Sequence, residues 1–150
     1  NTPTLSCQTT YYNANFGFDL PSTAELRESS KDEGGFVFTS YWVFLFEERF
    51  IGVSIRIVEE PPLSLEDWVA SGIVISESVG YAIVEVFPYT LSDGTPAYFT
   101  SKIGPFGAVY DVDVIANGYA YQLETNHGDN IPPDNAQALM ISILDSFCID

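Results

Sequence analysis

Residues 111–124 read DVDVIANGYAYQLE, and this stretch decides the fold. The Asn117-Gly118 pair stands between two alternating runs, which is a strong signal for a hairpin with a two-residue turn. A two-residue turn fixes the register, so Asp111 is expected opposite Glu124. One face of the hairpin then carries apolar side chains for a core, and the other carries oxygen-rich ones. We therefore expect an antiparallel sheet that extends outward from this hairpin.

The oxygen-rich face of the hairpin is a candidate metal site. The same register places Asp113 opposite Gln122, beside Asp111 and Glu124. Like charges directly across a ladder are unfavourable. These side chains therefore either stay hydrated or attract a hard cation such as Ca²⁺, which prefers oxygen ligands. We expect a hydrated acidic face, with a weak divalent-cation site as the alternative; no cofactor is required.

Alternating runs on either side of this hairpin predict further strands, and Asp93-Gly94 marks a second hairpin turn. The polar segment 22–35 carries Ser22 and Glu25 at the spacing of a helix-capping box. Strands, a helix, more strands and a last helix give an α+β chain with a mainly antiparallel sheet. Strands are expected over residues 9–13, 16–20, 36–46, 51–57, 81–89, 97–103, 109–116 and 119–125.

Two helices are expected. Ser64 caps the first, over residues 65–71, and Gly72 is placed to end it. Its buried stripe consists of Leu65, Trp68 and Val69. The second helix covers residues 135–147, and its apolar side chains recur at helical spacing. They are Ala136, Leu139, Met140, Ile143, Leu144 and Phe147.

The two cysteines, Cys7 and Cys148, stand near the two ends of the sequence. Domain termini often lie close together, so we expect a Cys7–Cys148 disulfide, with two unrelated thiols as the alternative. A disulfide implies a secreted, periplasmic or cell-surface location. The start at Asn1, without a Met or an apolar signal region, fits a form from which a signal segment has been removed. We expect residues 1–8 to form an N-terminal arm and residues 9–150 a single domain.

Charge and composition exclude several classes of partner. The 150 residues include 21 Asp and Glu but only 5 Lys and Arg, which gives a net charge of -16. Nucleic acids and anionic membranes require clustered cations, so both are excluded. The longest apolar run, residues 36–46, is too short for the ~20 residues of a membrane-spanning helix. The partner is therefore expected to be another protein or a second copy of this chain.

Motifs for catalysis are missing from the sequence. It contains no phosphate-binding loop, nucleophile elbow, CxxC pair or His-rich metal set. His127 is the single imidazole and is expected to be a turn residue. We expect no enzyme activity and no catalytic residues. The alternative is a carbohydrate-active enzyme that uses a pair of carboxylates.

Aromatic side chains offer anchors for a partner. Tyr11, Tyr12, Phe106 and Tyr110 lie in or beside short connections, where they either pack on the core or bind a partner. Residues 1–6 could also add to the exposed sheet edge of a neighbouring molecule. That arrangement would make the protein a self-assembling cell-surface or filament subunit.

Three motifs carry a family resemblance. They are YYNANFGFDLP at residues 11–21, LSLEDWV at 63–69 and ILDSF at 143–147. In this order and spacing the chain resembles PsbP-like proteins. The resemblance implies a three-layer α–β–α sandwich around an antiparallel sheet of about six strands. It also implies an exported or lumenal protein, as many bacterial lipoproteins of this family are, without catalytic residues.

The same resemblance bears on function. Plant PsbP supports the oxygen-evolving centre of photosystem II and docks through a basic N-terminal region. Residues 1–6 of this chain contain no Lys or Arg, so we do not expect that role. We expect instead a non-catalytic, extracytoplasmic module that binds or scaffolds another protein.

Overall fold

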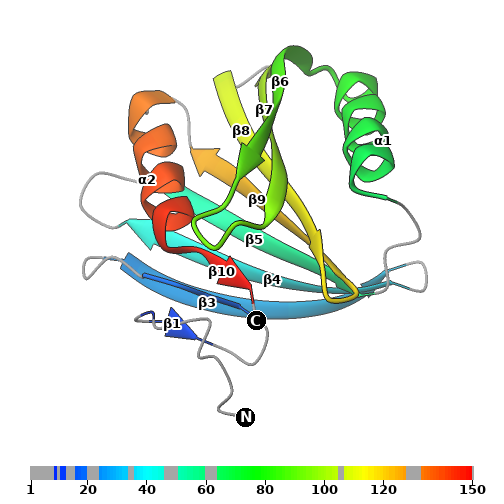
Figure 1. Cartoon of the computed structure of the whole chain (residues 1–150). Coiled ribbons are helices and arrows are strands. Elements are labelled where there is room, and N and C mark those ends of the chain that lie inside the picture. The colour runs from blue at the N-terminus through cyan, green and yellow to red at the C-terminus, as the bar shows by residue number, and fades with distance from the viewer. Residues whose placement is uncertain are drawn as a thin grey trace.

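The computed structural model describes residues 9, 11–12, 16–19, 24–33, 36–45, 51–59, 64–104, 107–127 and 133–149. Its main feature is a strongly twisted sheet of seven strands in the order β3-β4-β5-β9-β8-β7-β6, and every neighbouring pair is antiparallel (Figure 1). The strands are β3 (Ala24–Glu33), β4 (Phe36–Leu45), β5 (Ile51–Glu59), β6 (Ala82–Thr90), β7 (Pro96–Gly104), β8 (Gly107–Ala116) and β9 (Tyr119–His127).

A second, small sheet joins the two ends of the described chain. Its strands are β1 (Tyr11–Tyr12), β2 (Phe16–Phe18) and β10 (Cys148–Ile149), with β2 in the middle. Strands β1 and β2 lie within the ranges 9–13 and 16–20, where two strands were expected, and they pair with each other in antiparallel fashion. Strand β10 was not expected, because two residues after a helix carry no periodicity of their own.

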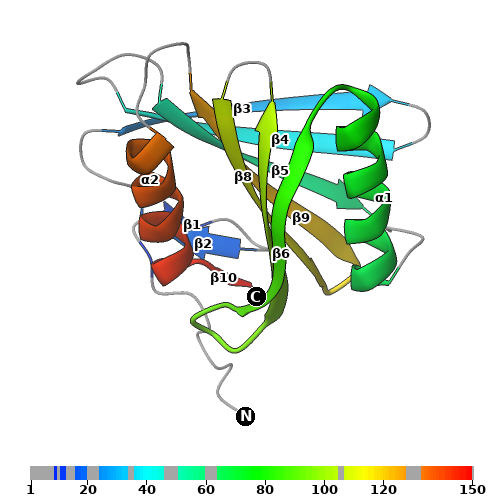
Figure 2. The ribbon, with the colours of Figure 1, turned by 90° about the horizontal axis from the view of Figure 1, so that it is seen from above.

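Two helices cover opposite faces of the main sheet. Helix α1 (Leu65–Ser78) packs against β6 and β8, whereas α2 (Pro133–Ser146) packs against β5, β8, β9 and the small sheet. Figure 2 shows the sheet between the two helices. The structure therefore has the expected three-layer α–β–α arrangement, with seven strands in the main sheet instead of about six. Neither helix of the described part is long and apolar enough to cross a bilayer.

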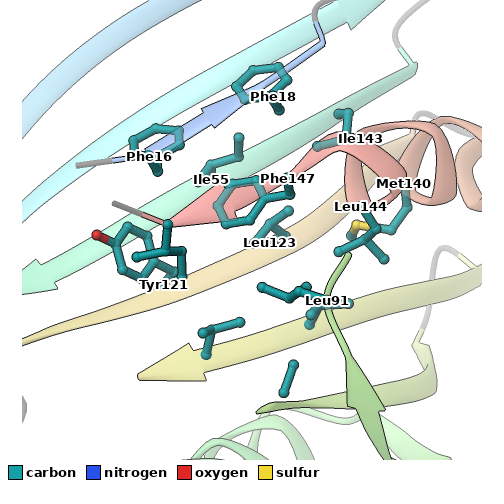
Figure 3. Close-up of a cluster of buried hydrophobic side chains, with 14 of the residues drawn as sticks. Phe16, Phe18, Ile55, Leu91, Tyr121, Leu123, Met140, Ile143, Leu144 and Phe147 are labelled. Atoms are coloured by element: carbon teal, nitrogen blue, oxygen red, sulfur yellow. The ribbon is translucent and has the colours of Figure 1, made fainter. Parts of the chain in front are cut away.

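The hydrophobic core lies between α2, the small sheet and one face of the main sheet (Figure 3). The rings of Phe16 and Phe18 in β2 stack against Phe147, with centroids 5.5 and 6.5 Å apart. The expected apolar stripe of the second helix is confirmed, since Met140, Ile143, Leu144 and Phe147 are all fully buried or nearly so. Burying large aromatic and aliphatic side chains is the main source of stability for such a sandwich.

The hairpin at residues 111–124 has the expected register. Asp111 pairs with Glu124, and Asp113 pairs with Gln122. The turn has φ angles of 54° at Asn117 and 82° at Gly118, the two positive values that a type I′ turn requires. The apolar face of the hairpin points into the core, where its side chains are completely buried. They are Val112, Val114, Tyr121 and Leu123.

Two local features differ from what the sequence indicated. Residues 24–33 form strand β3 and no helix, because this segment pairs along its whole length with β4, and tertiary pairing outweighs a local capping signal. Helix α1 also continues through Gly72 to Ser78. The glycine that ends it is Gly80, with φ 100° and its N–H donating to the carbonyl of Glu77.

Candidate functional site

The oxygen-rich face of the β8–β9 hairpin lies beneath helix α1. Asp111 and Asp113 are only 4% and 6% exposed, so the expectation that both carboxylates are hydrated was wrong. The sequence pattern placed these side chains on one face correctly. It could not show that α1 covers this face, because that depends on how the helix docks.

Lys102 of β7 supplies the positive charge that these carboxylates need. Its Nζ lies 2.8 Å from Oδ2 of Asp111 and 3.4 Å from Oε2 of Glu124. It also donates a hydrogen bond to Oγ of Ser76, at 3.1 Å, and lies 4.6 Å from the centre of the Tyr81 ring. We call Lys102, Asp111, Asp113 and Glu124 the ion cluster. Lys102 itself is 5% exposed, whereas the side chain of Glu124 is 32% exposed and forms the open margin of the cluster.

The ion cluster holds α1 at two points. Near the start of the helix, Nε1 of Trp68 donates to Oδ1 of Asp113 at 3.2 Å. Near its end, Ser76 accepts the hydrogen bond from Lys102. The helix enters with the expected cap, because Oγ of Ser64 accepts from the N–H of Asp67. Val69 is buried between these points, as expected for the inner stripe.

Burial shifts the pKa values of the cluster. Burial raises the pKa of Asp113 to about 7, although the hydrogen bond from Trp68 and the charge of Lys102 oppose the rise. Burial and the neighbouring Glu124 raise the pKa of Asp111 well above its usual value. Burial lowers the pKa of Lys102, but attraction to Asp111 and Glu124 outweighs it and leaves that pKa raised.

One oxygen of Asp111 lies buried without a donor. Oδ2 of Asp111 is bound by Lys102, but its buried Oδ1 has no hydrogen-bond partner among the described residues. A buried carboxylate oxygen without a donor is costly. Protonation of Asp111, in line with its raised pKa, removes the negative charge and so lowers this cost.

The predicted divalent-cation site falls on these same residues. Asp111, Asp113 and Glu124 lie in the ion cluster, and Gln122 lies beside them at the partly exposed margin. Within the described ranges, no three His, Cys, Asp or Glu side chains form a group that could hold a metal ion. Binding of Ca²⁺ stays a prediction. Calorimetric titration of wild type and of an Asp111→Ala/Asp113→Ala variant with Ca²⁺ tests it.

A second feature of α1 faces outward. Five large apolar side chains are exposed within residues 74–86, which form the end of α1, the turn after it and the first half of β6. We call them the α1–β6 surface; Figure 1 shows that α1 and β6 join at one corner of the molecule. Their exposed fractions are Val74 67%, Ile75 62%, Val79 63%, Val84 61% and Val86 38%. A helix with apolar side chains on its outer face as well as on its sheet-facing side is typically covered by another protein segment.

Two acidic side chains lie on the elements of the α1–β6 surface. Glu77 and Glu85 are both exposed, Glu77 on α1 and Glu85 on β6, where its pairing with Ser101 turns it to the side of the sheet away from α1. Between Ile57 and the end of the sequence the single Lys or Arg is Lys102, and its charge is used inside the ion cluster. No exposed cation therefore comes from α1 or β6 to balance these acids.

Of the four aromatic residues predicted to bind a partner, two have described side chains. Tyr11 and Tyr110 are partly buried and pack against the hydrophobic core, Tyr11 beside Phe18 and Tyr110 beside Phe99. The side chain of Tyr12 and the whole of Phe106 lie outside the described residues, as do the side chain of His127 and residues 1–8. The structure therefore brings none of the described anchors to an open face.

The predicted disulfide has one described partner. Cys148 is buried in β10, and its Sγ lies 3.7 Å from the carbonyl oxygen of Gly17 in β2. Cys7 lies outside the described residues, so the disulfide stays a prediction.

The sequence reasoning missed Lys102 and the α1–β6 surface. One signal for Lys102 was present, because it is the single cation in the second half of a very acidic chain. The α1–β6 surface gave no such signal. Val74 and Ile75 lie beyond Gly72, where the helix was expected to end, so their place on its outer face could not be predicted.

Comparison with known proteins identifies the fold. No protein-family model and no curated protein sequence matches the chain. Among solved structures it is similar to the solution structure of cyanobacterial PsbP (CyanoP) from Synechocystis sp. PCC 6803, with a TM-score of 0.70 and 14% sequence identity. The match covers 93% of this chain and 91% of that one. The sandwich of two helices around an antiparallel sheet is therefore the PsbP-like fold.

Proposed function

We propose that this protein is a non-catalytic, extracytoplasmic module that binds another protein through the α1–β6 surface. The observation that carries the proposal is the run of exposed Val and Ile side chains at residues 74–86. Apolar patches of this kind, rimmed by charged residues, mark interaction sites on proteins. Burial of each such side chain would contribute up to about 1.5–3 kcal/mol to binding.

Charge argues that the occupant is a different protein. The chain carries a net charge of -16, and the exposed Glu77 lies on α1 two residues after Ile75. Two copies joined through this surface would bring two strongly negative molecules together, and like charges across an interface cost several kcal/mol. A partner with basic residues around an apolar centre meets the same surface without that cost.

The burial of the ion cluster supports the non-catalytic part of the proposal. Asp111, Asp113 and Lys102 have shifted pKa values, and perturbed groups are the first candidates for catalysis. All three are sealed beneath α1. A substrate could reach them only if the helix left the sheet.

Two observations support the extracytoplasmic location. The first is the fold shared with PsbP. The second is the small sheet, in which β1 and β10 lie on either side of β2. Cys7 precedes Tyr11 by only four positions. Four residues span up to ~13 Å, which exceeds the distance of about 10 Å across two strand spacings. A Cys7–Cys148 disulfide is therefore within reach of this geometry.

Site-specific photo-crosslinking tests the binding surface. A photoreactive amino acid is placed at Ile75 and, as the control, at Ile141, an exposed isoleucine on the other helix. The protein that crosslinks to position 75 in the organism's own cells is identified and purified. Its affinity for wild type, Ile75→Ser and Ile141→Ser is then measured by calorimetric titration. We expect Ile75→Ser to weaken binding and Ile141→Ser to leave it unchanged. Equal affinities of wild type and Ile75→Ser would contradict the proposal.

A further inference from the structure

We infer that Lys102 and Asp111 condense in the folded protein to an isopeptide bond, which joins Nζ of Lys102 to Cγ of Asp111 and releases one water molecule. The two residues lie on the neighbouring strands β7 and β8, and Nζ is 2.8 Å from Oδ2 of Asp111. A carboxyl C–O bond is about 1.2 Å long, so Cγ lies within about 4 Å of the nitrogen. That approaches the ~3–3.5 Å at which bound groups are placed to react.

Burial favours the condensation. Lys102 is 5% exposed and Asp111 is 4% exposed, and the Tyr81 ring, with its centre 4.6 Å from Nζ, helps to keep water away. Two buried charges carry a high desolvation cost, whereas the amide that replaces them is neutral. Groups held in contact react as if present at roughly 10⁵–10⁸ M, which offsets the preference of water for the free acid and amine. The released water can leave at the open margin formed by Glu124.

The two carboxyl oxygens of Asp111 have different roles in this reaction. Oδ2 contacts Nζ and is the oxygen that leaves as water. Oδ1 has no hydrogen-bond partner among the described residues, and it stays as the oxygen of the amide. A neutral amide oxygen is less costly to bury without a donor than a carboxylate oxygen. The new amide N–H can donate to Oγ of Ser76, which lies 3.1 Å from Nζ, so the product keeps the contact with α1.

Glu124 is placed to move the proton that the reaction requires. Nζ of Lys102 is an ammonium in its ion pairs and has to lose a proton before it can attack. Oε2 of Glu124 lies 3.4 Å from Nζ, and Glu124 stands directly opposite Asp111 in the ladder. Its carboxylate takes one proton from Nζ, which then attacks Cγ. Oδ2 receives this proton from Glu124 and a second one from Nζ, and it leaves as water. The third proton stays on the nitrogen, and Glu124 is a carboxylate again.

Mass spectrometry tests the bond on protein that has been kept folded at neutral pH and is then reduced and unfolded. We expect wild type to weigh one water molecule less than its sequence. Trypsin gives a second readout, because Lys102 is the single Lys or Arg between Ile57 and the end of the sequence. Trypsin does not cleave after an acylated lysine, so residues 57–150 are expected to remain one fragment. A free Lys102 would give two fragments, 57–102 and 103–150.

Three variants connect the loss of water to these residues. Glu124→Gln keeps both reacting groups but cannot take the proton, so we expect it to retain its full mass and to be cleaved after Lys102. Asp113→Asn changes the neighbouring buried carboxyl and is the control, which should lose water as wild type does. Lys102→Met lacks the nucleophile and should keep the full mass of its own sequence.

Wild-type protein that retains its full mass and is cleaved after Lys102 would overturn the inference. Loss of water in Lys102→Met would overturn it as well, because the water would then come from another place in the chain. The reaction takes place once in each chain and uses no external substrate. Its presence or absence therefore leaves the proposed binding function unchanged.

Discussion

Lys102 is the residue on which the ion cluster depends. It neutralises Asp111 and Glu124 and also binds Ser76 of α1. Lys102→Met leaves the buried Asp111 and the partly exposed Glu124 without their counter-ion, and removal of one partner from a buried ion pair typically costs 3–5 kcal/mol. We expect the free energy of unfolding, measured by urea titration, to fall by about that amount. Arg56→Met, at an exposed cation on β5, is the control and should change it by less than ~1 kcal/mol.

Asp113 gives the protein an unusual dependence on pH. Its pKa is about 7 in the folded protein, above the ordinary value of 3.8, so the folded state holds a proton that the unfolded state has released. The free energy of unfolding contributed by this group is therefore fully present below about pH 4. It is lost as the pH rises toward 7 and changes no further above that.

The matching variant is Asp113→Asn, which keeps an oxygen acceptor for Trp68 but cannot titrate. Urea titrations between pH 4.5 and 7.5 should show a smaller loss of stability with rising pH in this variant than in wild type. Glu77→Gln, which removes an exposed acid on α1, should follow the wild-type profile. Parallel profiles for wild type and Asp113→Asn would show that the buried carboxyl is ionised throughout.

At the scale of the element, helix α1 contains a correctable weakness. Gly72 lies in the middle of the helix, and a Cβ added there meets nothing within 4 Å. Glycine in a helix costs about 0.5–1 kcal/mol relative to alanine. Gly72→Ala should therefore raise the free energy of unfolding by roughly that amount. Gly118→Ala is the control, because its φ of 82° strains any side chain, and it should lower stability. A fall in thermal midpoint for Gly72→Ala would contradict the open space seen beside it.

The elements differ in how far the sequence predicts them. The turns at Asn117-Gly118 and Asp93-Gly94 are decided by local backbone preferences, so both hairpins were predicted, and for the two-residue turn at Asn117-Gly118 the register was predicted as well. Residues 24–33 were not, because a polar segment becomes a strand only through pairing with β4. The sequence predicted the carboxylates of the ion cluster but not Lys102 or the helix that covers them. Alternation placed Asp111 and Glu124 on one face, but the cover by α1 and the reach of Lys102 depend on tertiary packing.

At the scale of the whole molecule, the small sheet links the two ends of the chain through Cys148. A Cys7–Cys148 disulfide predicts that intact mass measured after alkylation without reductant shows no added alkyl group, whereas reduction first allows two. In the chain-entropy model a bridge over so long a loop contributes about 4–5 kcal/mol, often less in practice. Cys148→Ser and the double serine variant should lose stability equally. Alkylation of both thiols in the unreduced protein would disprove the bridge.

The position of β2 also has a consequence for how the protein is made. Strand β2 is completed by β10, and Gly17 and Cys148 in these two strands are 131 residues apart. The rings of Phe16 and Phe18 also pack against the ring of Phe147, next to β10. A chain emerging from the ribosome with its amino end first cannot close this contact until residue 149 has appeared, and contacts of such separation form slowly. The small sheet is therefore completed last, after the residues of every hairpin in the main sheet have been synthesised.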